Sequence, residues 1–98
     1  DTYVPGEEPG DLLVLQGFAY FALGRYDDAV RSYQAVLARR PESPDVLYHL
    51  AQAQWMAGRP TDAAQAARQA LTLQPGHQES LAILEQIEVA AADGVHRR

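Results

Sequence analysis

The chain has 98 residues, a length that fits one small domain. Its 47% hydrophobic and 21% charged residues are typical of a globular protein, and its net charge of −5 argues against nucleic acid or an anionic membrane as the main partner. The absence of cysteine excludes disulfides, and no run of about 18 apolar residues could insert into a membrane.

Residues 1–10 combine prolines, glycines and acidic residues, a composition typical of a flexible tail. After this tail, apolar residues recur at helical spacing between short breaks. The pattern predicts five helices, at about residues 11–23, 26–39, 44–57, 60–73 and 78–92. Residues 93–98 are expected to form a frayed tail. No stretch alternates with a period of two, so no strand is expected.

Serine, proline and glycine mark the predicted helix ends. Ser43 before Pro44 is a helix cap followed by proline in the first turn, and Pro60 opens its helix in the same way. Gly24 and Gly58 are expected to adopt the left-handed backbone that ends a helix.

The two halves of the chain repeat one another at a fixed interval. The matching pairs are Gly24 and Gly58, Ala29 and Ala63, Leu37 and Leu71, and Pro41 and Pro75. The sequence numbers of every pair differ by 34, and a period of 34 with two helices per unit is the signature of the tetratricopeptide repeat. The segment GRYDDAVRSYQAVLARRP at residues 24–41 closely resembles the second half of that motif, and the resemblance extends over residues 10–92.

The resemblance implies an all-α fold, a solenoid of two tetratricopeptide-like helical hairpins arranged as a right-handed superhelix. The domain would span residues 11–92, with repeats at about 10–43 and 44–77 and a capping helix at 78–92. Small residues at Gly17 and Ala51 are expected to let the two helices of a hairpin approach closely. Tyr20 and Tyr33 would fill the space beside those gaps.

The fifth predicted helix has carboxylates at two positions where the earlier helices have uncharged residues. Glu85 and Glu88 stand one repeat after Ala51 and Gln54, at positions that pack against the second helix of the same hairpin. We expect these carboxylates to face water, as they would in a capping helix. The array is therefore expected to end within this chain.

The polar residues indicate no catalytic or metal site, so we expect neither an enzyme nor a cofactor. The histidines lack metal-ligand spacing and are expected to face solvent or lie at helix ends: His49, His77 and His96. No serine lies in a nucleophile elbow, and no Gly-rich phosphate loop is present. Asp27 and Asp28 favour the start of a helix, and Asp27 can pair with Arg31 one turn later.

A stripe of apolar and aromatic residues on the first helix of each hairpin is the candidate binding surface. On the first predicted helix this stripe lies about 100° from the one that faces the partner helix. In proteins that the chain resembles, the corresponding face lines a concave groove for extended peptides or partner helices. The predicted groove consists of Val14, Phe18, Phe21, Tyr48, Gln52, Trp55, Met56 and Gln86. Packing between repeats stays open as an alternative, above all for Phe21 and Trp55.

The lack of basic residues in the predicted groove also indicates which kind of partner it binds. Family members that grip acidic carboxy-terminal tails of cytosolic chaperones use Lys, Arg and Asn on this face. The matching places here contain no cationic pair: Val14, Phe18, His49, Glu79 and Ile83. We therefore expect an apolar or amphipathic protein or peptide segment rather than an anionic carboxylate.

Two other roles stay open. The repeats could mediate self-association, with the apolar cluster Tyr3, Val4 and Pro5 entering the groove of its own or a second copy, or they could position a neighbouring domain. Because the chain begins at Asp1 rather than Met, we expect a processed form or part of a longer protein. A cytoplasmic location is favoured, and a periplasmic or exported one stays open if an anchor precedes Asp1.

Overall fold

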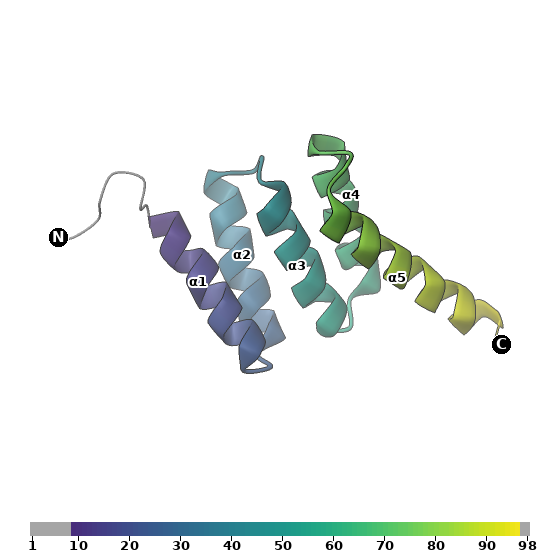
Figure 1. The fold of residues 1–98 in the computed structure, drawn as a ribbon. Coiled ribbons are helices and arrows are strands. Elements are labelled where there is room, and N and C mark those ends of the chain that lie inside the picture. The colour runs from purple at the N-terminus through teal and green to yellow at the C-terminus, as the bar shows by residue number, and fades with distance from the viewer. Residues whose placement is uncertain (1–8, 97–98) are drawn as a thin grey trace.

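A computed structural model describes residues 9–96 as five α-helices joined by short loops (Figure 1). The helices are α1 (Pro9–Ala22), α2 (Tyr26–Arg39), α3 (Pro44–Met56), α4 (Pro60–Leu73) and α5 (Gln78–His96). The described residues contain no strand, so the predicted all-α class is confirmed.

The helices stack in chain order as two hairpins, α1–α2 and α3–α4, followed by α5 (Figure 1). Each helix contacts the next one along the chain, and α3 also contacts α5. The molecule is elongated, with extents of 57 × 29 × 18 Å. Contacts limited to neighbouring elements are those of a repeat solenoid, as the period of the sequence predicts.

Two helix ends differ from the expectation by more than one residue. Helix α1 begins at Pro9, within the predicted tail, because proline suits the first turn of a helix; residues 1–8 of that tail lie outside the described residues. Helix α5 continues to His96, since the alanines at 90–92 are strong helix formers. Residues 97–98 of the predicted C-terminal tail also lie outside the described residues.

The two hairpins turn in the same way. Gly24 and Gly58 have φ of 77° and 82°, the left-handed conformation predicted for them. After each glycine, the next backbone N–H donates to a carbonyl earlier in the helix, from Arg25 to Tyr20 at 2.8 Å and from Arg59 to Gln54 at 2.9 Å. The same glycine-containing helix end therefore occurs once in each hairpin.

Close helix packing in the first hairpin depends on Gly17. Tyr33 of α2 is fully buried, and a Cβ atom on Gly17 would lie 2.8 Å from its Cζ and 2.9 Å from its Cδ1. The second hairpin achieves the same approach with alanines, because Ala51 and Ala67 are both fully buried. Gln54, which replaces Tyr20 in the repeat, is buried, and its Oε1 meets no donor within the described part of the chain.

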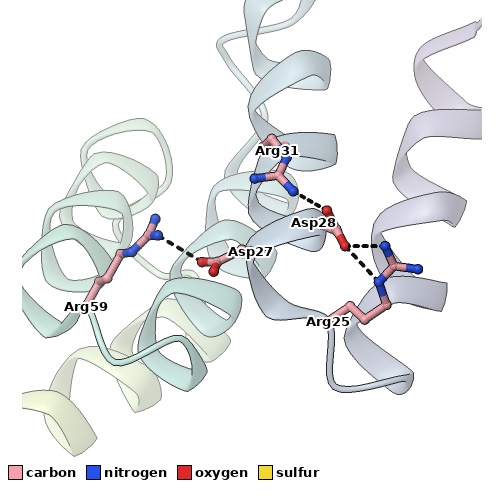
Figure 2. Close-up of polar contacts among 5 residues, drawn as sticks. All are labelled: Arg25, Asp27, Asp28, Arg31 and Arg59. Carbon is pink, nitrogen blue, oxygen red and sulfur yellow. Dashed lines mark hydrogen bonds and ion pairs between the residues drawn. The ribbon is translucent and has the colours of Figure 1, made fainter.

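Two polar contacts tie successive repeats together. Asp27, near the start of α2, accepts a hydrogen bond of 2.9 Å from Arg59, which precedes α4 (Figure 2). Asp45, near the start of α3, lies 2.7 Å from Nε2 of His77, which precedes α5. The two contacts have the same separation in sequence, and they link α2 to α4 and α3 to α5.

The expected pair between Asp27 and Arg31 is wrong. Arg31 instead pairs with Asp28, which also accepts from Arg25, as Figure 2 shows. Asp28 lies within reach of both arginines, one turn away on either side, which leaves Asp27 for Arg59.

His77 lies at the start of α5 but does not face solvent. Its side chain is 4% exposed, and Nδ1 lies 2.8 Å from Oγ of the fully buried Ser80. Because an ionised carboxylate only accepts, Nε2 donates to Asp45, and in the neutral ring Nδ1 accepts from the Ser80 hydroxyl. The buried imidazole therefore fixes α5 against α3.

Gly17→Ala should destabilise the domain by about 1–3 kcal/mol, because the added methyl group would overlap the buried Tyr33 ring. Helix propensity alone predicts the opposite sign. Urea denaturation followed by circular dichroism measures the change. Gly76→Ala is the matched control, since no atom lies within 4 Å of its added Cβ. Equal stability of Gly17→Ala and the native chain would contradict the close packing.

His77→Leu should destabilise the domain by about 1–3 kcal/mol, because Ser80 would be left buried without its partner. The double variant His77→Leu/Ser80→Ala removes both polar partners and should recover part of the loss. Thermal denaturation of the two variants measures the difference. A double variant no more stable than His77→Leu would show that the Ser80 hydrogen bond contributes nothing.

Candidate partner-binding groove

A groove of about 280 Å³ runs between α3 and α5. One wall comes from α3 and the other from α5, and the full lining is Tyr48, Gln52, Trp55, Met56, Glu79, Ala82, Ile83 and Gln86. The α3 residues recur at intervals of three or four, so they share one face of that helix. Ala82 and Gln86 stand one repeat after Tyr48 and Gln52, so α5 presents the equivalent face.

Five of the eight residues predicted for the groove line this one cavity: Tyr48, Gln52, Trp55, Met56 and Gln86. Met56 is 48% exposed, whereas Trp55 is half-buried and packs partly against the core. Ile83 is buried and forms part of the groove lining. Ala82, Ile83 and Glu79 were absent from the predicted set, although a shift of one repeat from Tyr48 identifies Ala82 directly, and Glu79 and Ile83 were already placed on the same face.

The three predicted residues of α1 lie apart from this cavity. Val14 and Phe21 are half-buried against the core, and the Phe21 ring lies 5.1 Å from that of Tyr26 within the same hairpin. Phe18 remains 41% exposed, with its ring 4.8 Å from His49 and 6.2 Å from Tyr33. Phe18 is thus the most exposed of the three predicted α1 residues.

His49 is half-buried among aromatic rings, so its expected exposure to solvent is wrong. It stacks on Tyr33 of α2 at 5.8 Å and lies 5.1 Å from Tyr48. Burial lowers the pKa of His49 and outweighs Asp45 and Glu79, which act to raise it. The apolar Leu15 and Ile83, one repeat before and one repeat after His49, were the sequence signal for this position.

Asp45, His77 and Ser80 have the residue types of a hydrolase triad, yet their arrangement is structural. Ser80 is fully buried, so its hydroxyl cannot reach a substrate. In the described part of the chain, no group of three or more His, Cys, Asp and Glu side chains could hold a metal ion. The trio therefore acts as the tie between α3 and α5.

Another cavity, of about 380 Å³, is lined by residues of α2, α3 and α4. Buried Leu47 and Leu50 contribute to its lining, and no aromatic side chain does. We interpret it as incomplete packing between the second helices of the two hairpins.

Apolar side chains of the first hairpin are exposed at and just after α1. Leu12 and Leu15 of α1 are 48% and 59% exposed, and Leu23, in the turn that follows the helix, is 72% exposed. Their equivalents one repeat later are Val46, which is buried, and His49 and Ala57, which are half-buried. These positions are therefore more exposed in the first repeat than in the second.

Across residues 9–96, none of the helices combines the length and hydropathy needed to cross a membrane.

Known proteins resemble the chain in both sequence and structure. A family model described as a tetratricopeptide repeat matches residues 14–77. The structure is similar to the crystal structure of the Sgt2 TPR domain from Aspergillus fumigatus, with a TM-score of 0.83 and 28% sequence identity. That likeness covers 88% of this chain and 58% of the other, so this chain spans under two thirds of the other's length. No curated protein matches the chain. Because the family model covers more than half of its residues, the chain belongs to the tetratricopeptide-repeat family.

Proposed function

We propose that the chain is a non-catalytic protein-interaction module whose groove between α3 and α5 binds an apolar or amphipathic segment of a partner protein. The observation that supports this most directly is the lining, in which Tyr48, Trp55 and Met56 lie together on one wall. Aromatic residues are enriched among binding hot spots, and the flexible Met side chain adapts to varied partners.

The groove suits a polypeptide segment in two further respects. Gln52 and Gln86 place a side-chain amide on each wall, and each amide can both donate to and accept from an extended backbone. The volume of about 280 Å³ falls just below the roughly 300–1,000 Å³ typical of small-molecule pockets. One or two anchoring side chains fit this space better than a whole cofactor does.

Filling the groove should abolish this binding. Ala82 is exposed on the α5 wall, so Ala82→Phe occupies the groove without removing a packed side chain. Peptides selected from a displayed random library on the native chain should bind the variant at least about 10-fold more weakly, a loss of about 1.4 kcal/mol. Fluorescence of Trp55, the only tryptophan in the chain, measures the affinity.

Ala35→Phe is the matched control, since Ala35 is exposed on α2, which contributes nothing to the groove. This variant should bind the selected peptides as the native chain does. Peptides that bind Ala82→Phe and the native chain equally well would place the binding site elsewhere.

A second role is favoured by the exposed face of α1. We propose that Leu12, Leu15 and Leu23 pack against the same face of a second copy, in a two-fold contact. Apolar side chains exposed close together usually mark an interaction site, and a second copy supplies the same apolar face.

Leu15→Glu should convert such a dimer into a monomer, because it would place two like charges at the contact. Sedimentation equilibrium over a range of concentrations measures the mass. Gln16→Glu, at a neighbouring exposed position of α1, adds the same charge and tests for a general charge effect. A native chain that stays monomeric at every concentration would rule out this role.

A further inference from the structure

One end of the groove is acidic. Asp45 of α3 and Glu79 of α5 place carboxylate oxygens 2.7 Å and 3.8 Å from the same nitrogen, Nε2 of His77. The Asp45 and Glu79 side chains are 81% and 60% exposed. Glu79 lines the groove and is open to a partner, whereas Asp45 lies beside it and accepts a hydrogen bond from His77.

No lysine or arginine in the groove balances Glu79. The chain has no lysine, and none of the arginines in its described part lines the groove. Arg25 and Arg31 pair with Asp28, Arg59 pairs with Asp27, and Arg68 lies 3.7 Å from Glu88. These cations are therefore already paired on other surfaces.

The acidic end also presents an aromatic ring. Tyr48 lines the groove one turn after Asp45 and lies beside His77, with ring centres 6.2 Å apart. A cation that pairs with Glu79 would also lie near this ring, where its interaction with the aromatic face adds to that with the carboxylate. Carboxylate and aromatic ring together favour an arginine or lysine side chain.

The apolar end of the groove lies two helical turns away. Trp55 and Met56 follow Tyr48 by seven and eight positions on α3, which corresponds to about 10–12 Å at roughly 1.5 Å per residue. An extended segment covers that distance in about three residues, at roughly 3.3 Å each.

We propose that the groove selects segments that place an arginine or lysine about 10 Å from an apolar anchor, with the cation between Glu79 and the Tyr48 ring and the anchor at Trp55 and Met56. This inference rests on the proposed function and specifies the chemistry of its partner.

A peptide selection on the native chain and on Glu79→Gln tests the proposal. Peptides selected on the native chain should be enriched several-fold in Arg and Lys, three positions from a large apolar residue. The enrichment should disappear on Glu79→Gln. Glu85→Gln is the matched control, because it removes an equal charge from an exposed position of α5 that does not line the groove.

A double-mutant cycle on one selected peptide then isolates the pair. Replacing the peptide's Arg by Gln should weaken binding to the native chain about 5–10-fold and should not change binding to Glu79→Gln. The change in Trp55 fluorescence measures binding to the native chain and to Glu79→Gln. Raising the salt from about 20 mM to about 500 mM should weaken the Arg peptide more than the Gln peptide, since screening acts on the charged pair.

The possible failures are distinct. Peptides that depend on the groove, as judged with Ala82→Phe, but show no excess of Arg or Lys would overturn the charge preference and leave the proposed function standing. Equal binding of the Arg and Gln peptides to the native chain would overturn it in the same way. Selected peptides that all ignore Ala82→Phe would overturn the proposed function, and this inference with it.

Discussion

The buried ring of Tyr33 is the contact on which the first half of the fold depends. It belongs to α2, fills the space that Gly17 leaves on α1, and stacks on His49 of α3. This side chain therefore sets the distance between α1 and α2 and also contacts α3 of the next hairpin. Burial raises the pKa of Tyr33 to about 12, so the ring stays uncharged across ordinary pH. In the second hairpin, alanines at 51 and 67 replace this aromatic joint with direct close packing.

Polar contacts between side chains 32 residues apart also hold the stack together, whereas equivalent positions of the repeat lie 34 residues apart. The His77 ring is buried in its bond to Asp45, whereas both side chains of the Arg59–Asp27 pair are exposed and solvent screens their charges. The bond from His77 to Asp45 also orients the walls of the groove. It holds the start of α5 against α3, and these two helices form the walls of the groove.

The sequence predicts the fold well because the repeat is local: each unit has a glycine at its turn, a small residue at its close approach and an apolar stripe on its first helix. Part of the groove is predicted, because a shift of one repeat transfers the apolar stripe from α3 to α5. The sequence does not predict the contacts between side chains in different repeats. His77 follows a glycine in a linker, a place that suggests exposure, and only the stacking of α5 on α3 buries it. Phe21 could equally have faced a partner or the core, and its contact with Tyr26 depends on the loop between α1 and α2.

The linear arrangement of the helices has a consequence for affinity. Within the described residues, α5 contacts only α4 and α3 to an appreciable extent, so it can open without disrupting the first hairpin. One wall of the groove is α5 itself. Part of the binding free energy of any molecule that contacts both walls is used to keep α5 in place. Such a molecule therefore also protects the amide hydrogens of α5 from exchange. Local order at this end of the solenoid and occupancy of its groove are therefore thermodynamically linked.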